Sequence, residues 1–311
     1  MRKRLISIAI PCFNEEENVV QAYKTLTAVT DKIRRYAFEF IYVDNGSSDK
    51  TRIKITSLCK KDRRVRGIYL SRNFGNEASI KASLDYTTGD AVILYFCDMQ
   101  EPASMIPVFI NKWENGFDNV VAVYTKTEDS LIVSKFRQLY YQIFKKLSYI
   151  DIPVQSHGFG LMGRNVLNAI NTIPDRSRFF RGLRAWVGFR TTYVLYKRLA
   201  RLHGKSTYGF WNYIQYAQNS FFGFSYLPLD FLIYIGFFLT TLSFLFIIGY
   251  LMYFFLYGNP IKGAVTIIVA IVFFGGVNML ALSIIGKYIQ VIVEETKNRP
   301  TYIVEEMEGF K

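Results

Sequence analysis

Acidic and amide side chains stand directly after several short apolar runs of this chain, and their oxygen atoms are the groups best suited to chemistry. Asp44 follows the run at residues 38–43, and Asp98, Gln100 and Glu101 follow the run at residues 91–96. An aspartate such as Asp44 can hydrogen-bond a base or a ribose. Closely spaced carboxylate and amide oxygens are hard ligands that suit Mg²⁺ or Mn²⁺, and such a cation would neutralise a diphosphate leaving group. The pattern therefore indicates a nucleotide or sugar-phosphate site.

The apolar runs before these residues have the length and composition of buried strands. Runs at residues 5–10, 38–43, 65–70 and 91–96 alternate with helical patterns at 19–29, 53–58 and 77–84. This alternation predicts an α/β fold with a mostly parallel sheet, in which ligands bind at the carboxyl ends of the strands. A single aspartate there is also a common helix cap or turn residue. A site is favoured because four polar residues fall at such ends: Asn14, Asp44, Asn73 and Asp98.

Two uninterrupted apolar stretches without a charged side chain lie near the C-terminal end, at residues 231–257 and 263–286. Each is long enough to cross a hydrocarbon core of ~30 Å at ~1.5 Å per residue. Residues 208–224 are rich in Trp, Tyr and Phe and almost free of charge. We expect one or two helices lying on a membrane surface there, with an ordinary core helix as the alternative. The chain is thus predicted to be a membrane-anchored domain.

The formal net charge is +13, and residues 176–205 contain nine Lys or Arg residues and no acidic one. Such a block attracts anions, and nucleic acid is one candidate. Because the block directly precedes the membrane segments, lipid headgroups and lipid phosphates are the nearer partners, and we expect no nucleic-acid partner. The positive-inside rule explains part of the block and places both the soluble domain and the residues after Lys287 in the cytoplasm. A further basic helix, containing Arg137, is expected between residues 120 and 153.

The cysteines and the N-terminal residues indicate a reducing, cytoplasmic environment for the soluble domain. Cys12, Cys59 and Cys97 are widely spaced without a C-x-x-C pair, so we expect reduced packing residues and neither a disulfide framework nor a zinc site. Residues 5–13 lack the cleavage pattern of a secretory signal and are better explained as a buried strand.

Four motifs occur in an order that is specific as a set: IAIPCFNEEEN at residues 8–18, VDNGSSD at 43–49, SRNFG at 71–75 and DMQEP at 98–102. In this order they resemble GT-A glycosyltransferases of family 2 and of the polyprenyl-phosphate type. The likeness is to dolichol-phosphate mannose synthases and, more closely, to the bactoprenol glucosyltransferases of O-antigen modification. It continues through residues 186–188, 198–208, both apolar stretches and 295–300, and so covers nearly the whole chain.

The resemblance implies transfer of a sugar from a nucleotide sugar, usually UDP-glucose, to undecaprenyl phosphate, with inversion and with Mg²⁺ or Mn²⁺ as cofactor. Positions around the base and ribose are matched by Pro11, Asn14, Glu15 and Asp44. Asp98 and Gln100 match metal ligands, and Asp98 is the expected catalytic residue. The acceptor phosphate is assigned to Arg198, Arg201, Lys205, Ser206 and Tyr208, with Arg137 as a further candidate. A lipid phosphate independently requires charge-assisted donors near the interface.

The resemblance also implies a domain order. A cytoplasmic GT-A domain with a mostly parallel sheet flanked by helices is expected at residues 1–205, an interfacial aromatic segment at 206–228, two transmembrane helices at 229–290 and a cytoplasmic tail at 291–311. The expected location is the bacterial inner membrane, crossed twice. Small residues in the second apolar stretch favour close helix contact and hence a homo-oligomer: Gly275, Gly276, Ala281 and Ser283.

Three departures from the family pattern fall in the expected site. The acidic pair after the second strand is Asp44 with Asn45, and the first aspartate of the D-x-D pattern is Phe96. The usual GDFRLM sequence is HGFGLM at residues 157–162. Gly158 thus replaces the carboxylate often assigned as the catalytic base, and Gly160 replaces a basic residue expected near the phosphates. An anionic acceptor phosphate hardly needs a general base, since its second pKa is ~6. Loss of a metal ligand at Phe96 is therefore the more serious change.

Two rival functions remain open. The first is a non-catalytic relative that binds a nucleotide sugar or polyprenyl phosphate as an accessory protein, which the clustered departures favour. The second is a processive polysaccharide synthase, which would carry a Q-x-x-R-W motif and more membrane helices, and the sequence has neither. The changed residues Asn45 and Phe96 are also explained if the pocket around them accepts a sugar nucleotide other than UDP-glucose.

Overall fold

The computed structural model describes residues 3–125, 155–175, 179–199, 227–257 and 264–310. The chain divides into two compact units. The first runs from the N-terminus to residue 220 and includes residues 298–311, and the second comprises residues 221–297.

One sheet organises the first unit. Among the described residues it has eight strands in the order β7-β5-β6-β4-β1-β2-β3-β8. The strands are β1 (Leu5–Cys12), β2 (Ala37–Asp44), β3 (Val65–Leu70), β4 (Ala91–Leu94), β5 (Asn119–Tyr124), β6 (Ser156–Gly163), β7 (Thr191–Tyr196) and β8 (Val304–Glu308). Only β6 and β8 run against their neighbours in this described sheet. The predicted α/β fold with a mostly parallel sheet is confirmed.

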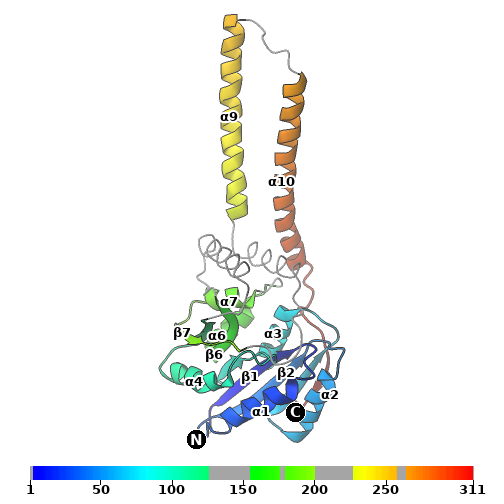
Figure 1. The fold of residues 1–311 in the computed structure, drawn as a ribbon, viewed down its shortest axis with the longest axis vertical. Coiled ribbons are helices and arrows are strands. Elements are labelled where there is room, and N and C mark those ends of the chain that lie inside the picture. The colour runs from blue at the N-terminus through cyan, green and yellow to red at the C-terminus, as the bar shows by residue number, and fades with distance from the viewer. Residues whose placement is uncertain (1–2, 126–154, 176–178, 200–226, 258–263, 311) are drawn as a thin grey trace. The chain divides into compact units, whose positions relative to one another are not determined.

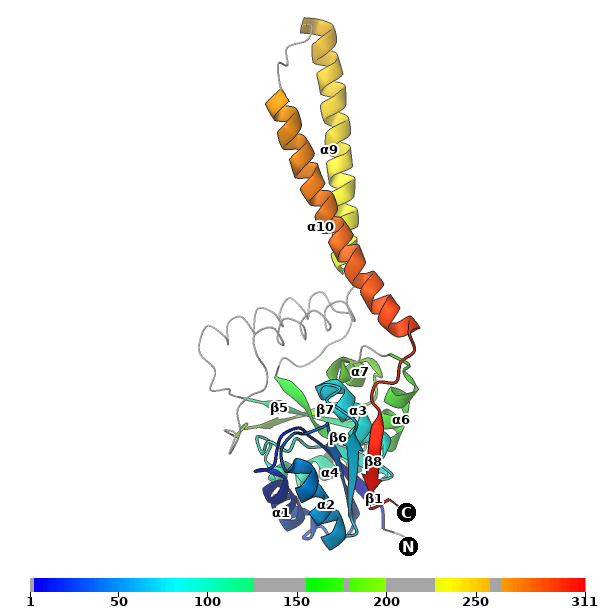
Figure 2. The ribbon, with the colours of Figure 1, turned by 90° about the vertical axis from the view of Figure 1, so that its right-hand side faces the viewer.

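Helices cover both faces of the sheet (Figure 1 and Figure 2). They are α1 (Val19–Thr30), α2 (Thr51–Lys61), α3 (Asn76–Asp85), α4 (Ile106–Glu114) after the short 3-10 turn η1 (Ala103–Met105), α6 (Arg164–Thr172) and α7 (Phe180–Trp186). The alternation of side chains along β2 explains the layers. Phe40 and Tyr42 pack with α1, α2 and α4 in the main core, whereas Ile41 and Val43 pack with Ala82 of α3.

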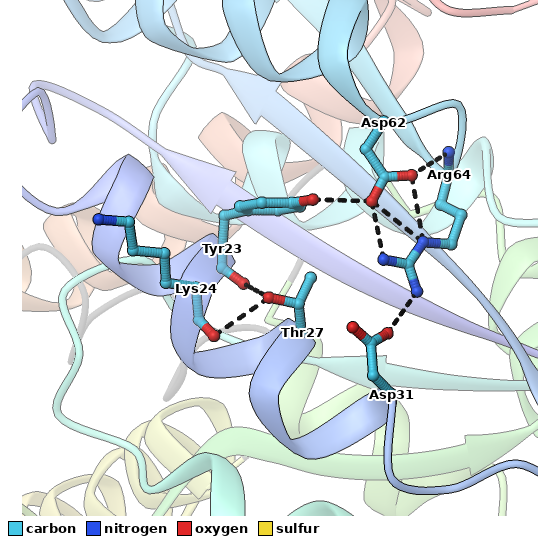
Figure 3. A network of polar contacts seen from close by, with 6 residues as sticks. All are labelled: Tyr23, Lys24, Thr27, Asp31, Asp62 and Arg64. Carbon is cyan, nitrogen blue, oxygen red and sulfur yellow. Dashed lines mark hydrogen bonds and ion pairs between the residues drawn. The ribbon is translucent and has the colours of Figure 1, made fainter.

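A polar network fastens α1 to the connection between α2 and β3 (Figure 3). The Tyr23 hydroxyl donates to Asp62 at 2.8 Å, and Arg64 donates to the same carboxylate at 2.8 to 3.1 Å. The second arm of Arg64 reaches Asp31 at 2.7 Å. Burial alone would raise the pKa of Asp62, but the hydrogen bonds from Arg64 outweigh it and lower that pKa. The network thus fixes α1 against the segment that leads into β3, at the end of the strands opposite their carboxyl ends.

The end of the chain adds an edge strand that the sequence analysis does not predict. Residues expected as a tail form β8, which pairs antiparallel with β3 from Gly67 opposite Glu308 to Leu70 opposite Val304. Its charged side chains form ion pairs, because Arg52 of α2 contacts Glu305 at 2.8 Å and also contacts Glu306. Acidic residues on an edge strand discourage pairing with other chains.

The second unit contains two long apolar helices, α9 (Leu227–Tyr257) and α10 (Ala264–Thr296). Candidate membrane spans lie at Phe231–Tyr257 and Phe273–Thr296, and neither is buried inside the protein. The first agrees with the predicted stretch. The second helix continues to Thr296, past the predicted boundary at residue 290, and its last turns carry the charged residues Lys287, Glu294 and Glu295.

The basic helix predicted between residues 120 and 153 does not begin at residue 120. Residues 120–124, expected to begin a basic helix, belong to β5, since the sequence Val-Val-Ala-Val favours a buried strand between β6 and β7. The rest of that predicted helix, and the aromatic segment at residues 208–224, lie outside the described residues.

Candidate active site

The ends of β1 and β2 form one side of the candidate site. The two strands are paired in register up to Cys12 opposite Asp44, and the backbone N–H of Asn45 donates to the Cys12 carbonyl at 2.9 Å. β1 has β2 on one side and β4 on the other. The parallel strands that carry Pro11, Asp44 and Asp98 therefore end at the same edge, where the strand order reverses and α/β proteins bind ligands.

The loops after β1 and β2 are joined by hydrogen bonds. The Asn14 backbone, in the left-handed region at φ 54°, donates to Ser47 Oγ at 2.8 Å, and Asn14 Oδ1 accepts from the Ser48 backbone at 2.9 Å. The Glu15 backbone donates to Thr51 Oγ1 at 2.8 Å. The loop that carries Asn14 and Glu15 is thus joined to the residues after Asp44 in one double loop. Pro11, the third residue predicted around the nucleotide, lies near the end of β1 that leads into it.

Asp44 is almost completely buried, with 2% of its surface exposed. Burial raises the pKa of its carboxyl, while a hydrogen bond from Ser47 at 3.2 Å opposes the shift. A buried carboxylate with few protein donors is well suited to accept hydrogen bonds from a base or ribose.

Asn45 has a structural role that the sequence analysis does not foresee. Its amide nitrogen donates to Asn73 Oδ1 at 3.0 Å and to the Gly75 carbonyl at 3.1 Å, and its amide oxygen accepts from the Phe74 backbone at 3.0 Å. The side chain therefore fastens the loop at residues 71–75 to the end of β2. Asn45, which replaces the second residue of the family's acidic pair, thus connects two loops. Its two donated bonds and one accepted bond require an amide side chain.

The loop after β4 carries Asp98, Gln100 and Glu101. Its turn is made by Met99, whose φ of 61° is uncommon for a residue with a side chain. The Gln100 backbone donates to Asp98 Oδ1 at 3.3 Å, a long hydrogen bond. Strained backbone of this kind occurs at functional sites, and here it lies between the two predicted metal ligands.

Glu101 is a buried carboxyl with unsatisfied hydrogen-bonding capacity. Only 2% of the residue is exposed, and its Oε2 has no hydrogen-bond partner among the described residues. Burial, and secondly the charge of Asp98, raise the pKa of Glu101 to about 8. Burial and the nearby carboxylate thus oppose a second negative charge beside Asp98, and a bound cation would favour ionisation of Glu101.

Arg198 joins this loop to the segment after β7. Its Nη2 donates to Gln100 Oε1 at 2.6 Å, and the Leu199 backbone donates to the Gln100 carbonyl at 2.9 Å. The guanidinium also lies 5.8 Å from the ring centre of Tyr124. The first residue of the predicted acceptor segment is thus in direct contact with a predicted metal ligand.

The oxygens of this loop fit a hard divalent cation. Mg²⁺ is usually held by one or two carboxylates together with substrate phosphates, and Asp98, Gln100 and the unsatisfied Oε2 of Glu101 supply oxygen atoms only. In the described parts of the chain no group of three or more His, Cys, Asp or Glu residues is arranged to hold a metal by itself. Substrate oxygens would have to complete the ligand set.

The two glycine departures lie on β6 in backbone conformations that favour glycine. Gly158 has φ 98° and Gly160 has φ 140°, and a Cβ on Gly160 would stand 2.1 Å from the Val120 carbonyl oxygen. The family's side chains at these positions would require a shifted backbone here.

A buried cation that the sequence analysis treats only as part of the basic block lies beside Gly160. Arg184 of α7 is 3% exposed, and its guanidinium donates to four oxygen atoms at 2.7 to 3.1 Å: Asn119 Oδ1 and the carbonyls of Gly158, Val120 and Leu161. Burial lowers the pKa of Arg184. Because its donors are used inside the protein, Arg184 supports β5 and β6 and does not replace the missing basic residue at position 160.

The remaining predicted acceptor residues, Arg137, Arg201, Lys205, Ser206 and Tyr208, lie outside the described residues. Phe96 is described and half-buried directly after β4, and its side chain offers no metal ligand.

Comparison with known proteins agrees with the motifs. The glycosyl transferase family 2 model matches residues 7–170. An uncharacterized glycosyltransferase of Synechocystis is 35% identical over 98% of this chain and 96% of its own. The bactoprenol glucosyl transferase of Shigella phage SfX is 36% identical over 96% of this chain and 98% of its own.

Among solved structures, glucosyl-3-phosphoglycerate synthase from Mycobacterium tuberculosis with Mn²⁺ and UDP-glucose is 17% identical, covering 70% of this chain and 76% of that one, with a TM-score of 0.45. That likeness is too distant to bear on the site. The family match and the near full-length relatives confirm the family predicted from the motifs: the chain belongs to glycosyl transferase family 2 and is a glycosyltransferase.

Proposed function

We propose that the chain transfers a sugar from a nucleotide sugar, UDP-linked and glucose-like, to undecaprenyl phosphate at the cytoplasmic face of a bacterial inner membrane, with inversion at the anomeric carbon. The observation that carries this proposal is the hydrogen bond from Arg198 to Gln100. It joins the loop assigned to the donor diphosphate to the segment assigned to the acceptor phosphate. Relatives named bactoprenol glucosyl transferases along nearly the whole chain support this choice of acceptor.

The nucleotide is assigned to the double loop after β1 and β2. Pro11, Asn14, Glu15 and Asp44 border it, and the buried Asp44 carboxylate accepts hydrogen bonds from the base or ribose. The loops are already joined by hydrogen bonds, so little conformational entropy is lost on binding.

Asp98 and Gln100 are the residues that would hold Mg²⁺ or Mn²⁺, with Asp98 as the catalytic residue. The cation supplies neutralisation of the charge that develops on the nucleoside diphosphate as it leaves. Gln100 Oε1 already accepts from Arg198, but an amide oxygen has two lone pairs and can serve both.

The acceptor is already a nucleophile. A phosphate monoester loses its second proton near pKa ~6, so attack at neutral pH needs no strong base, and Gly158 in place of a carboxylate is compatible with turnover. A phosphate oxygen forms the new bond to the anomeric carbon on the face opposite the diphosphate, which departs with the electron pair. Arg198, with Arg201, Lys205, Ser206, Tyr208 and Arg137 as further proposed contacts, holds the acceptor by charge-assisted hydrogen bonds. Catalysis is thus mainly positioning and electrostatic stabilisation.

The two apolar helices are proposed to cross the membrane as a hairpin. Both ends of the hairpin connect to the same compact unit, because the chain leaves that unit before α9 and returns to it as β8 after α10. This connection supports two crossings, which bring the chain back to the side from which it left. The basic residues before the helices put that unit in the cytoplasm, and small residues in α10 would allow a homo-oligomer.

The test is transfer of radiolabelled sugar from a panel of nucleotide sugars to undecaprenyl phosphate, using membranes that contain the full chain, with and without Mg²⁺ or Mn²⁺. We expect product with a UDP-sugar, loss of product with EDTA, and loss of at least about a hundredfold in Asp98→Asn. Asp31→Asn is the matched control, because it removes an exposed carboxylate at the C-terminal end of α1, whereas the site lies at the other end of that helix. Full turnover in Asp98→Asn would remove this residue from the mechanism.

A non-catalytic accessory role is the second candidate, and the clustered departures at Phe96, Gly158 and Gly160 favour it. The same panel separates the two. Nucleotide binding without transfer for any donor would establish the accessory role and reject the transferase.

A further inference from the structure

We propose that the C-terminal segment at residues 302–310 is a positioning element of the donor site, which holds the loop at residues 71–75 in place, so that nucleotide affinity depends on residues that follow the second apolar helix in sequence. The inference rests on the proposed function for the identity of the ligand. Its structural part concerns only the first compact unit.

The segment extends the pairing of β3 up to the loop itself. β8 pairs with β3 as far as Leu70 opposite Val304, with an irregularity between Tyr69 and Leu70. The next residue of the loop, Ser71, donates its backbone N–H to the Ile303 carbonyl at 3.1 Å. The backbone direction in which the loop leaves the sheet is thus set by the C-terminal segment.

Apolar contacts make the same connection through side chains. Phe74 of the loop packs in the small core beneath α3 together with Tyr302, Val304 and Phe310. Tyr302 also donates its hydroxyl to Asp85 at the end of α3 at 2.7 Å, and the Phe310 ring lies edge-on to Tyr86 at 5.9 Å. Phe74 therefore packs against the same small core that the C-terminal segment covers.

The loop carries this support to the nucleotide side of the sheet. The Phe74 backbone donates to Asn45 Oδ1 at 3.0 Å, and Asn45 is the residue directly after Asp44. Gly46 fits the close approach on the other side, because a Cβ there would stand 2.5 Å from the backbone carbon of Arg72. The hydrogen bond to Asn45 and the close approach of Gly46 to Arg72 connect the loop to the end of β2 at two points. A displacement of Phe74 would therefore be transmitted to the turn that contains Asp44.

An amide at position 45 is required for this connection. Asn45 donates to Asn73 Oδ1 and the Gly75 carbonyl while it accepts from Phe74. An aspartate would keep the bond from Phe74 but would place a charged oxygen against two other acceptors, which is repulsive. Asn45 and the C-terminal segment are thus two parts of one support for the loop, and neither is a catalytic residue.

The experiment compares two variants that each lose one phenol hydroxyl bound to a carboxylate. Tyr302→Phe removes the bond to Asp85, and Tyr36→Phe removes the bond from Tyr36 to Glu114, at 2.6 Å and remote from the loop. We expect Tyr302→Phe to raise the Kd for UDP, measured by calorimetry with Mg²⁺ on the full chain in detergent, by roughly three- to tenfold. The donor KM should rise equally and kcat should stay unchanged. Tyr36→Phe should leave the Kd for UDP, the donor KM and kcat within about twofold of wild type. Its Tm should fall about as much as that of Tyr302→Phe, since each variant loses one hydrogen bond.

A readout without ligand makes the inference independent of donor identity. Amide hydrogen exchange at Phe74 and Gly75 should be faster in Tyr302→Phe and in Asn45→Asp than in wild type, and unchanged in Tyr36→Phe. Asn45→Asp should weaken UDP binding more than Asn45→Gln, which keeps the donors and the acceptor. Unchanged exchange at Phe74 in Tyr302→Phe would overturn the inference even in an active enzyme. Absence of transfer by the wild-type chain, with the exchange pattern as expected, would overturn the proposed function alone.

Discussion

Arg198 donates a hydrogen bond of 2.6 Å to the side-chain oxygen of Gln100, and this contact joins segments 98 residues apart in sequence. The Leu199 backbone reinforces it by donating to the Gln100 carbonyl at 2.9 Å. A cationic side chain and a neutral amide thus share the position where two anionic substrates are proposed to meet. Arg198 can interact with the acceptor phosphate while its distance from the donor loop is fixed.

Replacing Arg198 should therefore affect the acceptor more than the nucleotide. In Arg198→Ala we expect the KM for undecaprenyl phosphate to rise about tenfold, as loss of one hydrogen bond to a charged group predicts, with the Kd for UDP within about twofold of wild type. The control is Arg190→Ala, which removes a guanidinium 4.6 Å from the Phe117 ring at the opposite end of β7. An equal change in both constants for Arg198→Ala would contradict the acceptor assignment.

The network in Figure 3 gives a prediction for pH. The pKa of Asp62 is lowered in the folded protein, so its contribution to the free energy of unfolding is present above the unfolded pKa of ~3.9 and is lost as pH falls through the lower folded pKa. Arg64→Ala should cost about 1 kcal/mol at pH 7, since the partly exposed guanidinium is screened by water. The difference from wild type should shrink toward pH 2. Thermal unfolding over a pH series measures it, with Arg35→Ala as the control for an exposed ion pair.

Gly160 should not tolerate a side chain. Gly160→Ala places a Cβ 2.1 Å from the Val120 oxygen and also requires a strained φ. The φ cost alone is ~1–2 kcal/mol, and Gly116→Ala isolates it, because a Cβ there meets only the flexible end of Arg190 at 3.2 Å. We expect a clearly larger loss of Tm in Gly160→Ala than in Gly116→Ala. Equal losses would show that β5 and β6 can separate at this point.

The free energy of unfolding should depend on the hydrogen-bonding geometry of Arg184, and a positive charge alone at this position should not be enough. Arg184→Met removes a charged donor from the buried oxygens of Gly158 and Val120, at a cost of ~1–3 kcal/mol for each hydrogen bond lost. Arg184→Lys should rescue little, since an ammonium on a flexible stem cannot reproduce the guanidinium geometry. Denaturant unfolding of both variants measures this. A fully stable Arg184→Lys would show that charge, and not geometry, is what β6 requires.

The periodic apolar runs were sufficient to predict the first half of the sheet. Strands β1, β2 and β3 and helices α1, α2 and α3 lie where the patterns place them, because local propensity and burial agree in repeated strand-helix units. β8 could not be predicted in this way. Three of its five residues are Glu, so its sequence resembles an exposed tail, and its strand conformation depends on pairing with β3.

The candidate site was predictable where chemistry follows strand ends, as for Asp44 and Asp98. The roles of Asn45 and Arg184 were not, because both depend on contacts between distant segments. The sequence shows at position 45 only the loss of an acidic residue, whereas the role of Asn45 depends on its hydrogen bonds to the loop at residues 71–75. Arg184 could not be distinguished from the other arginines of the basic block, since no feature of its sequence neighbourhood marks it as buried.

The position of β8 has a consequence for biosynthesis. A ribosome synthesises both hydrophobic helices before β8, so the edge of β3 that pairs with β8 stays unpaired in the nascent chain while those helices are made. If the two helices enter a bilayer as proposed, they can do so before β8 pairs with β3, and a chain truncated before β8 would keep that strand edge open.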